Sequence, residues 1–335
     1  MMPSKDELRR DFLCTANERP IFTLEEARAQ GPLGPASIAI GAFDGVHAGH
    51  RELIDRTVSE ARSCGRAAYA VTFDPDPDQV VSHHPVDHLL PMKDRLRLLS
   101  ASGADGVIVV PFTRELAALN HVSFFEDVLF GACTVEAIHV GSDFRLGAGG
   151  ASDVSVIRAW GVERGINVFG HDLVTDAGSP ISATRIRRYL AQGDVRSAAQ
   201  ELGRRYAVSG TVCAGRHEGT GFGFPTANIE VSHGIQLPLD GVYAGLAAVD
   251  GTAWPAAINV GLPPTFSDHP ESARLEANLI GFTGELYGRD CALAFDRRIR
   301  PSMRFDSTEE LISTVLGNIE DIRATFGEGG VRFDR

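Results

Sequence analysis

The sequence is poor in cysteine and tryptophan, and it contains no long apolar run. Its five cysteines are odd in number and scattered, with no C-x-x-C pair, which favours reduced thiols over a disulfide framework. No stretch approaches the ~18 consecutive apolar residues of a membrane-spanning helix. The opening residues MMPSKDELRRDF also lack the apolar core of a secretion signal. We therefore expect a soluble, cytoplasmic protein with no membrane partner.

Positive charge is also in short supply. Lys and Arg total 32 against 44 for Asp and Glu, and the resulting net charge of -12 disfavours nucleic acid as a partner. Hydrophobic residues make up 43% and charged residues 23%, which is typical of an ordinary globular chain. A chain of 335 residues is long enough for two domains, each with a core of its own.

In the first half of the chain, short β-branched runs alternate with helical patterns. The runs are apolar on both faces, as buried parallel strands are, and they lie at 37–41, 67–73, 106–110, 135–140 and 166–170. Helical spacing of apolar residues occurs between them, at 50–65, 93–99 and 124–130. This alternation predicts a doubly wound α/β domain whose ligands bind outside the carboxyl ends of the strands.

After about Tyr206 the pattern changes to strand-like runs separated by Gly, Pro, Asp and Asn, followed by one long helical pattern at 307–326. Six short strands and a terminal helix predict a small antiparallel barrel. Between the two patterns, two short helices broken at Gly193 are expected. The expected boundaries are an N-terminal extension at 1–35, an α/β domain at 36–185, a helical linker at 186–205, a barrel domain at 206–326 and a loose tail at 327–335.

A loop of glycines and histidines directly follows the first predicted strand. Residues 41–50 read GAFDGVHAGH, and a helix is expected to begin there, so that backbone N–H groups and the positive helix end can approach a phosphate. His47 and His50 can donate hydrogen bonds to phosphate oxygens. Two surface histidines are the plain alternative, but the position between the first strand and the first helix favours a nucleotide pocket.

A second phosphate-binding candidate is the segment ISATRIR at 181–187. Ser182 or Thr184 can cap the helix that follows, and Arg187 supplies a guanidinium that can neutralise charge at an α-phosphate under attack. Taken alone, such a string is more typical of an N-cap on a basic surface helix. Together with the histidine loop it indicates nucleotidyl transfer, which needs positioning and charge stabilisation but no covalent intermediate.

The second half of the chain carries a different set of polar residues. The segment GFGFPTAN at 221–228 follows a glycine loop, and the Thr226 hydroxyl and Asn228 amide oxygen suit Mg²⁺ that bridges ATP phosphates. A tight turn that enters a strand is the alternative. Glu276 lies in RLEANLI, on the opposite face from Leu275 and Ala277 if this run is a strand. An exposed strand glutamate is the plain alternative there.

Seven motifs in their order along the chain carry a resemblance to a known family. They are GAFDGVHAGH, VTFDPDP, VGSDFRLG, ISATRIR, GFPTAN, NVGLPPTF and LYG, and they extend from about residue 37 to about residue 326. The chain resembles the bacterial bifunctional riboflavin kinase/FAD synthetase family. The resemblance implies an α/β nucleotidyltransferase-type (Rossmann-like) parallel-sheet domain, the FMN adenylyltransferase, followed by a small antiparallel riboflavin kinase β-barrel with a C-terminal helix.

The same resemblance implies an activity and its partners. Riboflavin would be phosphorylated by ATP to FMN, and FMN would then be adenylylated by a second ATP to FAD, with release of pyrophosphate. Mg²⁺ is the implied metal, ATP the implied co-substrate, and FMN and FAD the intermediate and the product. Riboflavin, FMN and ATP are thus the expected binding partners.

The resemblance also assigns roles to individual residues. His47, His50 and Arg187 would stabilise the ATP phosphates during adenylyl transfer. Glu276 would be the general base of the kinase. The remaining implied contacts are to nucleotide or phosphate by Gly41, Phe43, Asp44, Gly45, Gly49, Ser182, Thr184, Gly221 and Gly223, to flavin by Asp74, Asp143 and Phe144, and to metal by Thr226 and Asn228. Turn formation is the open alternative for Asp74 and Asp143.

Several positions depart from the usual pattern of the family. Asp76 stands where a histidine is usual between two prolines, Ala183 replaces a serine, and Glu218, Thr220 and Pro263 stand where arginine is common. An acid at position 76 is expected to repel phosphate. Two alternatives therefore stay open: a divergent paralogue with one activity lost, or with a modified flavin or other nucleotide as substrate, and a non-catalytic flavin-binding module. The oligomeric state is also left open.

Overall fold

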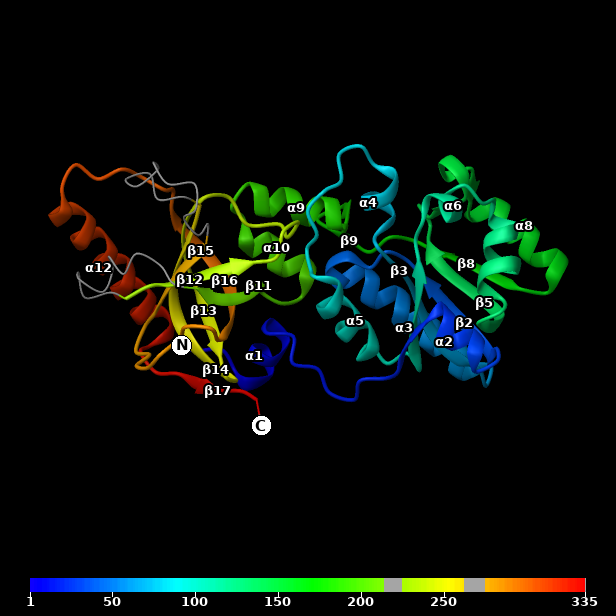
Figure 1. The fold of residues 1–335 in the computed structure, drawn as a ribbon, viewed down its shortest axis with the longest axis horizontal. Coiled ribbons are helices and arrows are strands. Elements are labelled where there is room, and N and C mark those ends of the chain that lie inside the picture. The colour runs from blue at the N-terminus through cyan, green and yellow to red at the C-terminus, as the bar shows by residue number, and fades with distance from the viewer. Residues whose placement is uncertain (214–224, 262–274, 335) are drawn as a thin grey trace. The chain divides into compact units, whose positions relative to one another are not determined.

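The computed structural model describes residues 1–213, 225–261 and 275–334. The chain forms two compact units, one of Thr15–Ala183 and one of Met1–Cys14 with Thr184–Arg335 (Figure 1). The residues expected to form an N-terminal extension, 1–35, are therefore divided. The segment up to Cys14 folds with the second unit, and the rest belongs to the first.

The first unit is built on a six-stranded parallel sheet. Its strands lie in the order β1-β4-β3-β2-β5-β8, and every neighbouring pair is parallel. Their bounds are β1 Ile21–Thr23, β2 Leu33–Ile40, β3 Ala67–Asp74, β4 Gly106–Pro111, β5 Cys133–Gly141 and β8 Asn167–His171. The five predicted strands and the α/β fold class are confirmed. The sequence missed β1, because three residues are too few to show a periodic pattern.

The helices of this unit connect the parallel strands. They are α2 Leu24–Ala29, α3 Ala48–Ser63, α4 Pro77–Val81, α5 Met92–Ser100, α6 Arg114–Ala117, α7 His121–Ser123 and α8 Val154–Arg164. The helices predicted around 50–65 and 93–99 are thus confirmed as α3 and α5. The α/β unit also contains the short antiparallel pairs β6 Arg145–Leu146 with β7 Ser152–Asp153 and β9 Thr175–Asp176 with β10 Ser179–Pro180.

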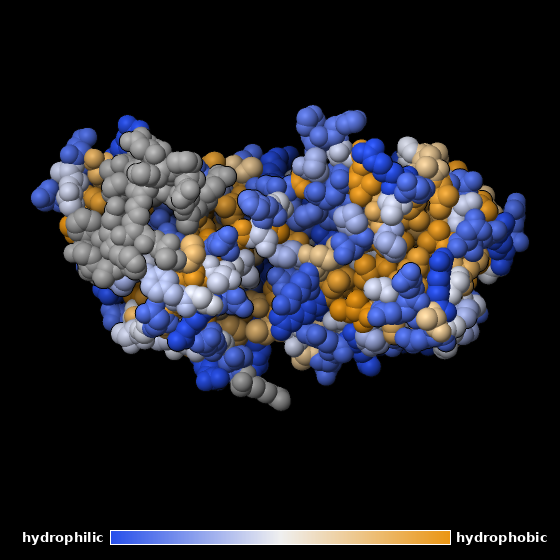
Figure 2. Space-filling view, viewed as in Figure 1, coloured by the Kyte–Doolittle hydropathy of each residue, from blue (hydrophilic) through white to orange (hydrophobic). Residues whose placement is uncertain are grey.

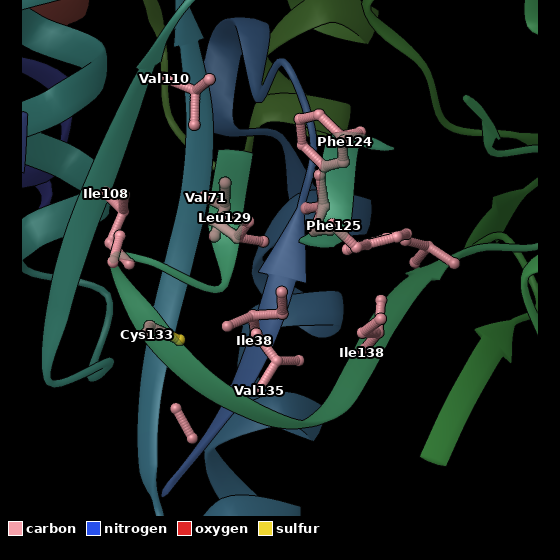
Figure 3. Packing of buried hydrophobic residues seen from close by; sticks show 14 of the residues in the cluster. Ile38, Val71, Ile108, Val110, Phe124, Phe125, Leu129, Cys133, Val135 and Ile138 are labelled. Atoms are coloured by element: carbon pink, nitrogen blue, oxygen red, sulfur yellow. The ribbon is translucent and has the colours of Figure 1, made fainter. Parts of the chain in front are cut away.

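The helix predicted at 124–130 is a π-helical segment, η2 Phe124–Leu129. Phe124, Phe125 and Leu129 are all buried in the core. The five-residue spacing between Phe124 and Leu129 matches the wider π turn, which brings both side chains to the same side of the segment. Figure 3 shows these three side chains gathered with core side chains of the strands, among them Ile38, Val71 and Ile138.

The second unit contains a closed antiparallel barrel. Its strands are β11 Tyr206–Cys213, β12 Ala227–Val231, β13 Gly241–Val249, β14 Thr252–Val260, β15 Leu275–Leu279 and β16 Asp290–Arg300. They lie in the order β13-β16-β11-β12-β15-β14, and pairing of β13 with β14 closes the ring. The predicted barrel and its terminal helix, α12 Thr308–Phe326, are confirmed.

The two short helices expected before the barrel are present as α9 Ala183–Ala191 and α10 Val195–Leu202. The break between them falls at Gly193, whose φ of +76° lies in the left-handed region. A side chain there would also be crowded, because a Cβ would lie 2.8 Å from Cδ of Arg298. Glycine therefore suits this position on both conformational and steric grounds.

Both ends of the chain pack onto the barrel. Helix α1 Lys5–Asp11 contributes Leu8 to a core cluster that also contains Ile322 of α12. The expectation of a loose tail is wrong for the last described residues, because β17 Val331–Arg332 pairs with β14. Phe333 is only 2% exposed and its ring stacks on that of Phe12 at 5.3 Å. The glycine-rich segment 327–330 is typical of a loose terminus, but the apolar side chain of Phe333 that follows it packs into the core.

Within the described residues, no helix combines the length and apolar character needed to cross a bilayer. Figure 2 shows hydrophilic residues distributed over the visible face of both units, with apolar areas between them. Apolar atoms at the surface of this kind are ordinary for folded chains.

Phe333 provides a test of the packed tail. Phe333→Ala is expected to lower the free energy of unfolding of the barrel by about 3 kcal/mol, because it removes a buried aromatic side chain. Urea unfolding in a Trp160→Phe background, where Trp254 of β14 reports on the barrel, measures the change. Arg332→Ala is the matched control, since its side chain is 68% exposed and its loss is expected to cost less than about 0.5 kcal/mol. Equal stability of the two variants would contradict a packed tail.

A buried histidine in contact with a second, half-buried histidine makes the stability of the α/β unit depend on pH. His139 of β5 is 2% exposed, and its Nδ1 lies 2.9 Å from Nε2 of His171. Burial lowers the pKa of His139 to about 4, and the charge of His171 acts in the same direction, against the opposing effect of Glu60. Between the unfolded pKa of ~6.5 and this value, the unfolded chain binds a proton that the folded chain does not.

We therefore expect the free energy of unfolding of the α/β unit to fall by about 1–2 kcal/mol between pH 7 and pH 5 on account of His139. His139→Gln should remove most of this loss, whereas the exposed His84→Gln should leave it in place. Urea unfolding in a Trp254→Phe background, where Trp160 reports on the unit, measures both. The same acid loss with and without His139 would refute the assignment.

Candidate functional site

The carboxyl ends of three adjacent strands bring together most of the residues selected in the first half of the sequence. Strand β2 lies between β3 and β5, where the strand order reverses, which is the usual ligand site of such sheets. Gly41 directly follows β2, and Asp74 is the last residue of β3. Asp143 and Phe144 lie in the loop that follows β5, where Asp143 is exposed and Phe144 is half-buried. The sheet thus brings these four positions to one edge.

The loop after β2 has an unusual backbone. Phe43, Gly45 and Val46 have φ values of 55°, 77° and 40°, all in the left-handed region. Phe43 and Val46 are also buried, at 0% and 3% exposure, so tertiary packing holds non-glycine residues in a conformation they otherwise avoid. Strained conformations of this kind concentrate at functional sites.

The two histidines of the loop meet at the N-terminus of α3. His47 is the N-cap residue, and its Nδ1 accepts a hydrogen bond from the backbone N–H of His50 at 3.3 Å. An accepting Nδ1 in a neutral imidazole leaves the proton on Nε2, so His47 presents a donor. The two rings stack with centroids 3.6 Å apart. Both side chains therefore lie at the positive end of a sixteen-residue helix.

His50 is kept neutral by its surroundings. Burial lowers its pKa well below the ordinary value, and repulsion from the His47 ring, when that ring is protonated, and from Arg95 and Arg51 acts in the same direction. Its Nδ1 is buried and has no hydrogen-bond partner within the described part of the chain. An unpartnered buried nitrogen of this kind is ready to bond a ligand.

Gly49 allows the close approach of two segments to the start of α3. A Cβ at Gly49 would lie 3.2 Å from Cε1 of His47 and 3.8 Å from the carbonyl oxygen of Ile181. The residue before Ser182 is thus adjacent to the histidine loop. The boundary between the two units falls just beyond, between Ala183 and Thr184. Thr184 and Arg187 stand on α9, which continues into the second unit.

Two acidic residues near the loop are engaged in internal contacts. The carboxylate of Asp44, 5% exposed, accepts hydrogen bonds from the backbone N–H of Leu89 at 3.0 Å and of Leu90 at 3.4 Å. Asp76 is also 5% exposed and forms a bidentate ion pair with Arg95 at 2.5 and 2.6 Å. The expectation that Asp76 repels phosphate is therefore wrong, because a buried guanidinium neutralises its charge.

Arg95 was missed in the sequence. Arg95 stands four residues before Leu99 in MKDRLRLLS, which places it on the apolar stripe of the predicted helix. A charged side chain at such a position needs a buried partner, and this could have identified it.

The barrel brings together a second set of polar residues. Asn228 of β12 lies directly opposite Glu276 of β15, and Glu276 lies directly opposite Asn259 of β14. Directly opposed residues project to the same face of a sheet, with Cβ atoms about 4.5–5.5 Å apart. Leu275 and Ala277 are each 1% exposed, so they face the interior and Glu276 lies on the opposite face, as predicted. Three polar side chains therefore share one outer face of the barrel.

The start of β12 is held by a side chain of β15. The side-chain amide of Asn278 donates to the carbonyl of Pro225 at 2.8 Å, and the exposed Thr226 stands directly before the strand. Asn259 was missed because AAINVG gave only a strand pattern. Gly221 and Gly223 lie outside the described residues, as do Glu218, Thr220 and Pro263.

The oxygen atoms of Thr226, Asn228 and Glu276 are of the kind that Mg²⁺ binds in proteins. A hydroxyl, an amide oxygen and a carboxylate are hard ligands, and Mg²⁺ usually completes its shell with substrate phosphates and water. In the described ranges no group of three or more His, Cys, Asp and Glu side chains forms a metal cage.

Two family descriptions match the chain in succession. The FAD synthetase family matches residues 30–185 and the riboflavin kinase family matches residues 202–326. The first range contains the histidine loop and the second contains the polar face of the barrel.

Relatives with both parts match nearly the whole chain. The bifunctional riboflavin kinase/FMN adenylyltransferase of Escherichia coli K12 is 32% identical over 92% of this chain and 97% of its own. The protein of the same description from Pseudomonas fluorescens is 30% identical over 85% of this chain and 91% of its own. A solved structure described as a macrolide-efflux protein from Streptococcus pneumoniae superposes with a TM-score of 0.80 at 26% identity, over 90% of this chain and 98% of its own. The chain therefore belongs to the family of bifunctional riboflavin kinase/FMN adenylyltransferases, with both enzymatic domains present and a function in flavin cofactor biosynthesis.

Proposed function

We propose that the loop after β2 carries the adenylylation of FMN and that the outer face of β12, β14 and β15 carries the phosphorylation of riboflavin. The observation that carries the assignment is the direct register of Asn228, Glu276 and Asn259, which puts a carboxylate between two amides. The stacked histidines at the start of α3 support the other site. The loop after β2 lies within the first matched family range and the outer face of β12, β14 and β15 within the second.

In the adenylyltransferase, the chain's task is to hold phosphates and to stabilise charge. A phosphate oxygen of FMN attacks the α-phosphorus of ATP, the bond to the bridging oxygen breaks, and pyrophosphate leaves with that oxygen. The Nε2–H of His47, the ring of His50 and the N–H groups at the start of α3 are donors suited to the developing negative charge. Arg187 and Thr184 would add a guanidinium and a hydroxyl. Asp74, Asp143 and Phe144 would line the flavin side of the pocket.

In the kinase, the carboxylate of Glu276 takes the proton from the terminal ribityl hydroxyl of riboflavin. The hydroxyl oxygen then attacks the γ-phosphorus of ATP, and ADP leaves. Thr226 and Asn228 would hold Mg²⁺, which when bound neutralises charge on the ATP phosphates. Gly221 and Gly223 would let the backbone approach those phosphates. Asn259, opposite Glu276, is placed to orient the carboxylate or the hydroxyl.

The alternatives left open by the sequence have no support in these findings. Positive charges missing near the expected phosphates suggested a lost activity or a non-catalytic module. At the loop after β2, however, Asp76 is neutralised by Arg95 and adds no exposed negative charge.

Incubation with riboflavin, ATP and Mg²⁺, followed by chromatographic separation of FMN from FAD, tests both activities at once. Formation of FAD supports the proposal, and recovery of riboflavin alone would refute it.

We propose the cytoplasm as the location of both reactions.

Glu276→Gln is expected to reduce FMN formation by about 10²–10⁴-fold, because it removes the general base while keeping the shape of the side chain. Adenylylation of added FMN should be unchanged. Glu230→Gln is the matched control, since Glu230 lies two residues beyond Asn228 on the same face of β12 and is exposed. Equal loss of FMN formation in the two variants would show that the effect is one of surface charge.

His50→Ala is expected to have the reverse effect. Loss of a donor at the α-phosphate should slow FMN adenylylation by about 10²–10³-fold, and riboflavin phosphorylation should be kept. His84→Ala removes an exposed histidine of the same unit and serves as the control. Loss of both activities in folded His50→Ala protein would contradict the division of labour between the two units.

A further inference from the structure

A cluster of four charged or titratable residues, three of them buried, includes one residue of the histidine loop. Its centre is Arg95 of α5, which is 1% exposed. Its Nη1 and Nη2 donate to the two carboxylate oxygens of Asp76 at 2.5 and 2.6 Å, and its Nη2 lies 3.6 Å from Oδ1 of Asp44. The Nδ1 of His88 lies 2.8 Å from Asp76. We call Asp44, Asp76, His88 and Arg95 the Arg95 cluster.

Asp76 is charged within this cluster. Burial raises its pKa, but hydrogen bonds from His88 and Arg95 and the positive charge of Arg95 outweigh the burial, so that the pKa lies below its ordinary value. The bidentate geometry fixes the plane of the guanidinium relative to the carboxylate. A buried guanidinium without such a partner would be strongly destabilising. Asp76 is thus the group that holds Arg95 in place.

Arg95 reaches the loop itself through a backbone contact. Its Nη1 also donates to the carbonyl oxygen of Ala42 at 2.9 Å, and the hydroxyl of Thr72 donates to the same oxygen at 3.2 Å. Ala42 directly precedes Phe43, the first left-handed residue of the loop. Two donors on one carbonyl fix the peptide plane that enters this turn.

The conformation of this turn determines where His50 stands. The Phe43 ring is fully buried and contacts the His50 ring edge-to-face, with centroids 5.2 Å apart. The ring of His47 stacks on the His50 ring as well. A continuous series of contacts therefore runs from Asp76 through Arg95, Ala42 and Phe43 to the histidines.

We propose that Asp76 and Arg95 are positioning residues of the adenylyltransferase site, which hold the loop after β2 in the conformation that binds the ATP phosphates. The proposal rests on the proposed function of this loop. Neither side chain needs to touch the nucleotide. The acid at position 76 is the counter-ion of Arg95, and its charge is directed into the unit.

This assignment and a phosphate contact at position 76 predict opposite effects of one substitution. If position 76 faced phosphate, Asp76→His would replace an acid by a donor and lower the KM for ATP. If Asp76 is the partner of Arg95, the same substitution places an imidazole against a buried guanidinium and displaces the Ala42 carbonyl. The KM for ATP in FMN adenylylation then rises.

The experiment measures KM for ATP, KM for FMN and kcat for Asp76→His, Asp76→Asn and Arg95→Met in the full chain. Each is expected to raise the KM for ATP by about tenfold, the effect of losing one charge-assisted hydrogen bond, with a much smaller change in the KM for FMN. Arg97→Met, which removes a half-exposed arginine of the same helix, is the matched control and should keep wild-type constants. Arg95→Lys should raise the KM for ATP less than Arg95→Met does, because the lysine ammonium keeps the positive charge but cannot form the bidentate pair with Asp76.

Riboflavin phosphorylation by the same variants reports on the other unit and should stay unchanged. A lower KM for ATP in Asp76→His, or wild-type constants in both Asp76→Asn and Arg95→Met, would overturn the inference. If one variant fails to fold, the isosteric Asp76→Asn and the milder Arg95→Lys still decide the question. Absence of FMN adenylylation in the wild-type chain would instead refute the proposed function, so the two failures are distinguishable.

Discussion

The left-handed turn between β2 and α3 is the constraint around which the α/β unit is organised. Phe43 and Val46 hold positive φ values although they are not glycines, and each such residue costs on the order of 1–3 kcal/mol. The turn persists because its side chains are buried and because the Ala42 carbonyl has two donors. The turn ends at His47, which caps α3 with its own ring and so directs its Nε2 toward ligands at the helix N-terminus.

In the barrel, the corresponding constraint is closure of the ring of strands by pairing of β13 with β14. A one-residue slip of β15 against its neighbours would turn Glu276 into the core and Leu275 outward. Pairing of β15 with both β12 and β14, and of β13 with β14, forbids that slip. The carboxylate is therefore kept between Asn228 and Asn259 by the backbone pairing of the three strands. The α/β site depends on a strained turn, whereas the barrel site depends on register.

Apolar periodicity and contiguous motifs were enough to predict the features that depend on local sequence. The five long parallel strands, the barrel strands and the outward face of Glu276 could all be read from apolar spacing. Features that depend on distant pairing could not. β1 is three residues long and gains its stability from β4, and Phe333 is recognisable as a core residue only once Phe12 lies against it. The opposition of Asn259 to Glu276 depends in the same way on register between strands.

Asp76 shows why a family pattern alone misjudged one position. A motif assigns a role to a position from what usually surrounds it, and an acid next to phosphate then reads as repulsive. The electrostatic effect of a carboxylate depends on what neutralises it, and here a guanidinium from a helix nineteen residues further along the chain binds both of its oxygens. The Coulomb attraction within an ion pair is stronger in this low-dielectric setting than at the surface, and removing one partner is costly because it leaves a buried charge uncompensated. The departure from the usual histidine is therefore compatible with a working phosphate site, provided that position 95 carries the matching charge.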